Sequence, residues 1–160
     1  MPAIATGTTN IVISGLGGQG VLKASDIIAE LALRAGLDVK KSEIHGMSQR
    51  GGSVSSDVRF GPKVFSPMVP EGEADYLLVL AAEWIDVNRS ALKPGGVLIE
   101  PSMIDEKKLR NKKSLNVALL GVLSRYLDFP EDAWRAAILA NLPEKLHEAN
   151  IQAFAIGRQQ

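Results

Sequence analysis

The sequence predicts an α/β domain: a Rossmann-like, three-layer fold whose mostly parallel sheet carries one β-hairpin insertion and is followed by C-terminal helices. Three observations lead to this prediction. A β-branched run at residues 10–14 passes through a glycine-rich turn into apolar residues at helical spacing. Runs at 76–80 and 97–100 are continuously apolar, which is typical of strands buried on both faces. The last third of the chain, from residue 116, has helical periodicity.

The first unit is a strand, a turn and a helix. The strand at 10–14 ends at the glycine turn 15–20, and the helix after it ends at Gly36, because glycine is the usual residue just past a helix C-terminus. A crossover connection then leads to residues 38–43, which are expected to form the second parallel strand.

A hairpin is predicted next. Alternating apolar residues over 54–60 indicate a strand, and Gly61-Pro62 breaks it. Residues 64–66 resume an apolar pattern briefly, so the two segments are expected to pair with each other.

The second half contains a strand, a helix, a strand and then helices. Residues 83–92 are expected to be a short helix and 93–96 (KPGG) a turn before the strand at 97–100. A helical turn is expected within 105–110. The C-terminal helices are predicted at 116–126, 130–141 and 143–156, with Pro130 near a first helical position.

Composition limits the function. The chain has 160 residues and reads as one domain, residues 1–160. Its 18 basic and 18 acidic residues give no electrostatic case for nucleic acid or a membrane surface. No apolar run approaches the roughly 20 residues that span a bilayer, and the first ten residues do not resemble a signal peptide. With no cysteine, the chain cannot form disulfides or ligate iron–sulfur clusters through thiolates. No metal site is predicted, and a cytoplasmic setting is expected.

The glycine turn is the first candidate site. Gly15, Gly17 and Gly20 fit G-x-G-x-x-G between a strand and a helix, where helix N-terminal amides favour a phosphate. Gly18 is an additional glycine, and Gln19 can point its amide at a partner. These five residues are the candidate cofactor contacts. The alternative is that the glycines only pack the helix against the sheet.

The stretch Ser42–Ser53 is the second candidate. Its paired glycines, Gly51 and Gly52, suit neither a helix interior nor a strand, so a shaped loop is predicted that serves a site or an interface. Gly51, Gly52 and Ser53 are assigned to cofactor contact. Met47, a soft apolar side chain, and Gln49 are assigned to a subunit interface.

Three charged or titratable residues of this stretch are candidate catalytic support residues. Arg50 can bind a carboxylate or phosphate through two parallel hydrogen bonds, or it can form a structural salt bridge to Glu43 or Asp57. His45 can shuttle protons, or it can orient the loop by a hydrogen bond. Glu43 can orient either of them, and its place at the end of the second strand also suits a ribose hydroxyl.

Four segments together resemble one protein family: GLGGQGV at 15–21, SEIHGMSQRGGSVSSDVRFG at 42–61, FSP at 65–67, and Ala74-Asp75 before YLLVL. They are similar to the gamma subunits and gamma domains of 2-oxoacid:ferredoxin oxidoreductases of the pyruvate and ketoisovalerate type, and in particular to the beta subunits of indolepyruvate ferredoxin oxidoreductases. The closing segment, with Asn116–Gly121 and Trp134, looks like the family's last helices. The resemblance covers roughly residues 10–158.

The resemblance implies an accessory role. Such complexes decarboxylate a 2-oxoacid on thiamine diphosphate, pass electrons through iron–sulfur clusters to ferredoxin, and give the acyl group to coenzyme A. Thiamine diphosphate and the clusters would lie on larger partner subunits, with no cofactor on this chain alone. The isolated chain would be inactive, would meet ferredoxin only indirectly, and can form a homodimer. Its Gly15–Gly20 turn and its His45–Ser53 loop would line the thiamine–coenzyme A cleft.

The sequence departs from the family at one place, since residues 101–115 are shorter than the corresponding family segment. Two other functions therefore stay open. One is a free-standing dinucleotide-binding domain, and the other is a non-catalytic interaction protein that keeps the fold. The lysines at 107, 108, 112 and 113 are expected to be a solvated face, or else a docking patch for acidic ferredoxin or coenzyme A phosphates.

Overall fold

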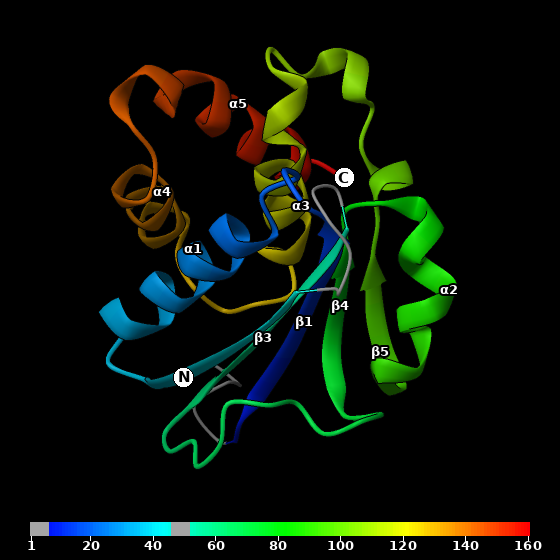
Figure 1. The fold of residues 1–160 in the computed structure, drawn as a ribbon. Coiled ribbons are helices and arrows are strands. Elements are labelled where there is room, and N and C mark those ends of the chain that lie inside the picture. Colours follow the sequence, from blue (N-terminus) through cyan, green and yellow to red (C-terminus); the bar gives the residue numbers. More distant parts are fainter. Residues whose placement is uncertain (1–6, 46–51) are drawn as a thin grey trace.

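The computed structural model describes residues 7–45 and 52–160, in which a five-stranded sheet has the order β2-β3-β1-β4-β5 (Figure 1). The strands are β1 (Thr9–Leu16), β2 (Asp38–His45), β3 (Ser53–Gly61), β4 (Ala74–Val79) and β5 (Leu92–Ile99). The helices are α1 (Val21–Arg34), α2 (Ile85–Asn88), α3 (Leu115–Leu123), α4 (Glu131–Ala140) and α5 (His147–Arg158). The C-terminal helices and the helical turn within 105–110 (Glu106–Lys108) are as predicted.

The sheet is mostly parallel, as predicted. β1 pairs in parallel with β4, and β4 with β5, whereas β3 is antiparallel to both β1 and β2. β2 therefore runs in the same direction as β1, β4 and β5. However, it is not hydrogen-bonded to β1 as expected, because β3 lies between them.

The hairpin is present, but its strands are not the predicted ones. β3 pairs with β2 along its whole length, from Asp38 opposite Gly61 to His45 opposite Val54, so the hairpin is β2–β3. Residues 64–66 are not a strand. The Val64 N–H instead donates to the Asp38 Oδ2 atom over 2.8 Å. Periodicity located β3 correctly, but it does not say which neighbour a strand takes.

The predicted turn at 93–96 was also wrong. β5 runs through these residues, and its pairing with β4 jumps from Ala74–Leu92 to Tyr76–Val97. Gly95 has φ 81°, a value that glycine tolerates. The KPGG segment is thus a bulge inside a strand, because the pairing on either side of it is strong enough to hold the chain in the sheet.

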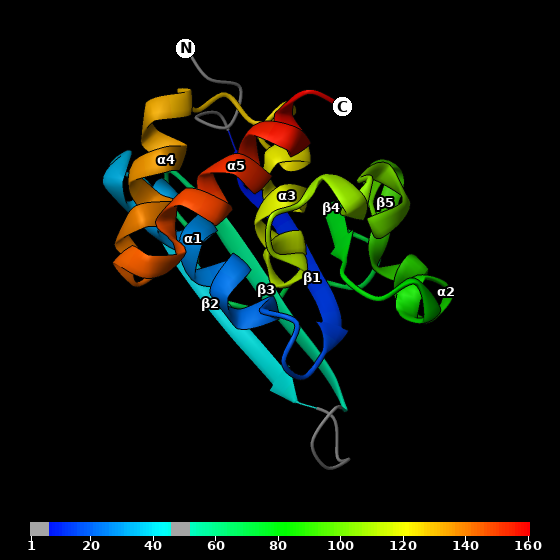
Figure 2. The same cartoon turned by 90° about the horizontal axis from the view of Figure 1, so that it is seen from above.

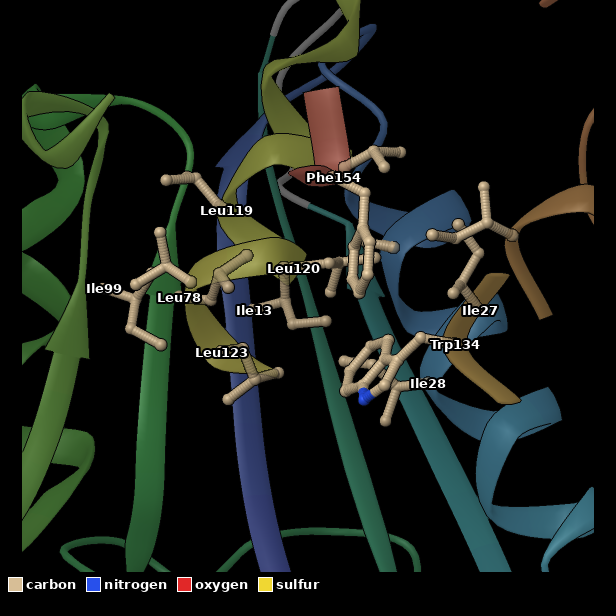
Figure 3. Close-up of a cluster of buried hydrophobic side chains, with 14 of the residues drawn as sticks. Ile13, Ile27, Ile28, Leu78, Ile99, Leu119, Leu120, Leu123, Trp134 and Phe154 are labelled. Atoms are coloured by element: carbon tan, nitrogen blue, oxygen red, sulfur yellow. The ribbon is translucent and has the colours of Figure 1, made fainter. Parts of the chain in front are cut away.

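Helices cover both faces of the sheet, which gives three layers. The main core joins one face to α1, α3, α4 and α5, and a smaller core joins Val12, Leu77 and Val79 on the other face to the α2 region. Figures 1 and 2 show α2 apart from the other four helices. Figure 3 shows the main core, in which the buried Trp134 ring packs against Phe154 at a centroid distance of 5.6 Å. No helix of the described residues is long and apolar enough to cross a membrane.

Candidate functional site

The glycine turn lies where β1 ends and α1 begins, beside the end of β4. Gly18 and Gly20 have φ values of 88° and 84°, which favour glycine. Gly20 immediately precedes α1, and its carbonyl accepts the Ala24 N–H over 3.0 Å. In an open α/β sheet, the carboxyl ends of neighbouring parallel strands with helices on opposite faces are the usual ligand-binding edge. The turn therefore occupies the expected position for a site.

The Gln19 side chain is turned inward and joins the ends of β1 and β4. Its Oε1 atom accepts the Leu16 N–H over 2.7 Å, and its Nε2 atom donates to the Leu80 carbonyl over 3.2 Å. The Leu80 N–H in turn donates to the Ser14 carbonyl over 2.8 Å. The carboxamide that the sequence suggested would face a partner is thus bonded within the chain.

Two further contacts fix the turn to distant parts of the sequence. The Gly17 N–H donates to the Gly52 carbonyl over 2.8 Å, which joins the turn to the start of β3. The Asn116 Nδ2 atom donates to the Gly20 carbonyl over 3.1 Å, while its Oδ1 atom accepts the Val117 N–H over 2.9 Å. A Cβ at Gly20 would overlap the Asn116 amide. The structure therefore brings together the two predicted glycine segments and adds Asn116, which the sequence analysis missed.

Two pockets flank the turn. The first, of about 440 Å³, is lined by residues of the turn, of the first turn of α1 including Lys23, and by Val54. The second, of about 250 Å³, is lined by Gly18, Gln19, Leu80, Glu106, Lys112, Lys113 and Leu115. Both lysines are exposed. Lys112 and Lys113 thus lie in the surroundings of the turn, whereas Lys107 and Lys108 of the same charged segment do not line this pocket.

Ser53 lines a different pocket. This pocket, of about 120 Å³, lies between the strand ends and α2, and Ser14, Ser55 and Asn88 also line it. The Asn88 Nδ2 atom donates to the Ser14 hydroxyl over 2.9 Å. Ser53 directly follows Gly52 and begins β3, but it is not one of the residues around the Gly18–Gln19 pocket.

The other predicted residues are only partly described. His45 ends β2, while Met47, Gln49, Arg50 and Gly51 lie outside the described residues, so their assigned roles stay predictions. The Glu43 Oε2 atom lies 3.3 Å from the Lys41 Nζ atom, which also pairs with Asp26 of α1. Because β3 separates β2 from β1, Glu43 is not on the strand next to the turn, which argues against the ribose role.

One carboxylate near this sheet has a raised pKa. Burial raises the pKa of Asp57 on β3, while the Val69 N–H, which donates to its Oδ2 atom over 2.8 Å, lowers it. Within residues 7–45 and 52–160, no three His, Asp or Glu side chains come together as a metal site would require. Around the turn, the described charged groups are the lysines and the Glu106 carboxylate, so the pocket beside Gly18 has two positive charges against one negative charge.

The chain is similar to known proteins along most of its length. A family model for pyruvate ferredoxin/flavodoxin oxidoreductase matches residues 10–105 and 102–160. Indolepyruvate oxidoreductase subunit IorB of Thermococcus kodakarensis is 35% identical over 190 residues, which cover 92% of this chain and 93% of the relative.

Solved structures show the same fold. The gamma subunit of keto/oxoacid ferredoxin oxidoreductase from Geobacter sulfurreducens superimposes with a TM-score of 0.79 at 27% identity, covering 96% of this chain and 95% of that one. The pyruvate oxidoreductase subunit PORC of Thermotoga maritima superimposes with a TM-score of 0.78 at 20% identity, covering 96% of each chain, and this likeness concerns the fold alone.

The comparisons also bear on the short segment after β5. The alignment with IorB spans 190 positions but uses 92% of these 160 residues, about 147, so about 43 positions of the alignment have no residue in this chain. The family-model match is in two pieces that meet at 102–105. We therefore place the missing stretch directly after β5, in agreement with the short segment seen in the sequence.

Proposed function

Because the chain belongs to the pyruvate ferredoxin/flavodoxin oxidoreductase family, we propose that it is the small accessory subunit of a complex that oxidises a 2-oxoacid with ferredoxin as electron acceptor. In this reaction the 2-oxoacid and coenzyme A give an acyl-coenzyme A and carbon dioxide, and two ferredoxins each accept one electron. Thiamine diphosphate on a larger subunit would stabilise the carbanion that decarboxylation leaves. Iron–sulfur clusters would also lie on partner subunits, because this chain has no cysteine.

The observation that supports this proposal best is the family match over nearly the whole chain, combined with the contacts of the turn. In a dinucleotide-binding turn, the second glycine lets its backbone approach the pyrophosphate. Here the amide of that glycine, Gly17, donates to Gly52 instead, and the Leu16 amide donates to Gln19. The turn thus has fewer free donors than the dinucleotide alternative needs, which favours the accessory-subunit proposal.

Copurification is the test of this function. We expect the chain, tagged and isolated from its native cells, to bring down larger subunits that contain thiamine diphosphate and iron–sulfur clusters. The isolated complex should reduce ferredoxin with at least one of a panel of 2-oxoacids that includes indolepyruvate, pyruvate and 2-oxoglutarate. Recovery of a lone monomer that binds NAD would overturn the proposal. A complex that stays fully active after this chain is deleted would favour the non-catalytic interaction protein.

Within the complex, we propose that the pocket beside Gly18 forms part of the coenzyme A cleft. Lys112 and Lys113 bring two positive charges to this pocket, against the one carboxylate of Glu106, and lysine ammonium groups bind phosphates as point charges. We also propose that the protein is located in the cytoplasm. When isolated, the chain can form a homodimer through the surfaces that its partners otherwise cover.

Charge reversal tests the cleft. We expect the double variant Lys112→Glu, Lys113→Glu to raise KM for coenzyme A about tenfold, about 1.4 kcal/mol of binding free energy, with kcat nearly unchanged. The matched control is Lys107→Glu, Lys108→Glu, which changes the same number of charges in the same exposed segment but outside the pocket. Equal effects of the two double variants on KM would show that only the general charge of the surface matters.

A further inference from the structure

Gln19 occupies the place on the turn where a ligand would enter. Its carboxamide is a bridge between the carboxyl ends of β1 and β4, with one hydrogen bond to the Leu16 N–H and one to the Leu80 carbonyl. The gap between these two strand ends is the crevice in which open α/β sheets bind ligands. In this chain a side chain of the turn itself fills that crevice.

Gly15 has a role that follows from this bridge. A Cβ at Gly15 would lie 2.9 Å from the Gln19 Oε1 atom and 3.0 Å from both the Leu80 Cβ and the Val21 Cγ2 atoms. The first glycine of the motif is therefore needed to admit the carboxamide between the strand ends. The residues of the motif thus depend on one another: the absence of a Cβ at Gly15 leaves space for the Gln19 carboxamide, and this carboxamide accepts the Leu16 N–H.

The effect continues to Gly17, the next residue. Because Leu16 is held by Gln19, both through its N–H and by the Gln19 N–H that donates to its carbonyl over 3.1 Å, the Gly17 N–H is oriented toward the Gly52 carbonyl. Gly52 immediately precedes β3, the return strand of the β2–β3 hairpin. The carboxamide thus lies at one end of a chain of bonds whose other end is the start of β3.

We propose that Gln19 is a positioning residue: its carboxamide fastens the ends of β1 and β4 together and thereby holds the Gly17–Gly52 contact, which sets the start of β3 beside the cleft. Gln19 acts through the two hydrogen bonds that its carboxamide makes within the chain. The part of this proposal that concerns turnover rests on the proposed function, whereas the coupling within the chain does not.

The coupling is tested on the whole isolated chain by amide hydrogen exchange. Gln19→Met keeps the length of the side chain and removes both hydrogen bonds. We expect the Leu16 and Gly17 amides to exchange roughly tenfold faster or more, with the amides of Ile27 and Ile28 in α1 unchanged. A faster Leu16 amide with an unchanged Gly17 amide would overturn the proposal, as would no change at either.

The chain contains a matched control for this substitution. Gln152 also bridges two backbone groups: its Oε1 atom accepts the Arg110 N–H over 3.3 Å, and its Nε2 atom donates to the Lys108 carbonyl over 2.8 Å. Gln152→Met should raise exchange at Arg110 and leave Gly17 as it is. Faster exchange at Gly17 in this variant would show general loosening rather than coupling through Gln19.

Gln19→Glu adds a pH profile that a general loss of stability would not produce. Ionised, the carboxylate accepts the Leu16 N–H but faces the Leu80 carbonyl without a proton to donate; protonated, it reproduces both bonds of glutamine. We expect protection of the Gly17 amide, relative to the parent chain, to recover as the pH falls through the carboxyl pKa, while Gln152→Glu leaves the Gly17 ratio flat. A flat ratio in Gln19→Glu would overturn the proposal.

The assembled complex gives the functional readout. The ratio of Gln19→Glu activity to parent activity should rise over the same pH range, and the ratio for Gln152→Glu should not. If exchange shows the coupling but activity is flat across this range, Gln19 positions the turn without effect on turnover, and the functional part of the proposal is wrong. If no 2-oxoacid is oxidised by any complex, the proposed function fails while the exchange result still stands.

Discussion

Asp57 and Asp38 are two carboxylates that hold the same irregular segment but have opposite pKa shifts. Asp57 accepts the Val69 N–H and is buried, and burial raises its pKa above 3.8. Asp38 accepts the Val64 N–H, and this backbone hydrogen bond is the main cause of its lowered pKa. The difference arises because desolvation outweighs the hydrogen bond only where the carboxylate is withdrawn from water.

The first prediction concerns pH and stability. Because Asp57 binds its proton more tightly in the folded chain, its contribution to the free energy of unfolding is fully present below pH 3.8 and is lost as the pH rises through the raised folded pKa. Asp57→Asn keeps an acceptor for Val69 and removes the titration. We therefore expect the stability of Asp57→Asn relative to the parent chain to increase with pH over this range, as measured by urea unfolding.

Asp38→Asn is the matched control, since the sign of its effect is opposite. The lowered pKa of Asp38 contributes stability that is present above pH 3.8 and is lost as the pH falls through the folded pKa. Its relative stability should decrease as the pH rises. If the two difference curves slope in the same direction, burial does not govern Asp57.

At the residue scale, the sequence indicates which side chains are unusual but not what each one contacts. The Gly15–Gly20 motif was recognised as a turn between strand and helix because its spacing is local. The inward bond from Gln19 to Leu80 joins residues 61 positions apart, and the bond from Asn116 to Gly20 joins residues 96 apart. Such pairs depend on how the strands and helices pack, which no local pattern records.

At the scale of elements, the crossing of α3 and α5 is the tightest contact between helices that the glycine positions reveal. A Cβ at Gly157 would overlap the Ala118 carbonyl oxygen and lie 2.9 Å from the Gly121 Cα atom. A Cβ at Gly121 would meet the Phe154 carbonyl and lie 2.9 Å from the Gly157 Cα atom. The two helices approach so closely because each has a glycine at the crossing.

The second prediction tests this crossing. Gly157→Ala should lower the free energy of unfolding by about 3 kcal/mol, because backbone atoms on the facing helix must move to admit the methyl group. Gly7→Ala is the control, because nothing lies within 4 Å of a Cβ at Gly7. Denaturant unfolding measures both variants. Equal free energies of unfolding for Gly157→Ala and Gly7→Ala would show that α3 and α5 can move apart to admit the methyl group at little cost.

Most elements could be predicted because their patterns are long and local. Val54, Val58 and Phe60 alternate with polar residues, and the structure has strand β3 at these positions. The helices at the end of the chain have a clear helical periodicity, and their bounds lie within a few residues of the predicted ones. The three errors in the sheet, which include the expected place of β2 beside β1, all concern pairing. The partner of β3 and the passage of β5 through Pro94 and Gly95 depend on neighbouring strands, so they are properties of the sheet and not of the segment.

At the scale of the whole molecule, the sheet ends in two unlike edges. One edge is β2, which belongs to the β2–β3 hairpin. The other edge is β5, and we placed directly after it the stretch of about 43 aligned positions of IorB that have no residue in this chain. In the described ranges, β5 pairs with β4 alone. Beside it, Ser102, Met103, Val122, Arg125, Tyr126 and Gln160 line a hollow of about 530 Å³.

The third prediction follows from this edge. In the isolated chain, outward-facing amides of β5 at Val97–Ile99 should exchange with solvent at least about a hundredfold faster than amides of the central strand β1, because they have no partner strand. Amide exchange at two protein concentrations measures this. Protection of β5 that rises with concentration would show that the homodimer forms through this edge. Protection equal to that of β1 at all concentrations would contradict the open edge.

The site could be predicted only in part, because it is assembled from segments that lie far apart in the sequence. The two glycine segments, 35 residues apart at Gly17 and Gly52, were assigned to one site through the family resemblance, and the structure joins them. Lys112 and Lys113 line the pocket beside Gly18, although they are 94 and 95 residues from it in the sequence. The sequence left open whether they are a solvated face or a docking patch, because no local pattern places them beside the turn.

The bulge in β5 has a consequence for the chain before it meets its partners. An exposed, flat, apolar edge strand is a template for aggregation, because any extended segment can hydrogen-bond to it. The first half of this edge has an exposed lysine at 93, a proline without an N–H at 94 and a kinked glycine at 95, all features that stop strands from adding. Only Val97–Ile99 remain as a short regular edge. An added strand could therefore pair only with this short stretch of the described edge.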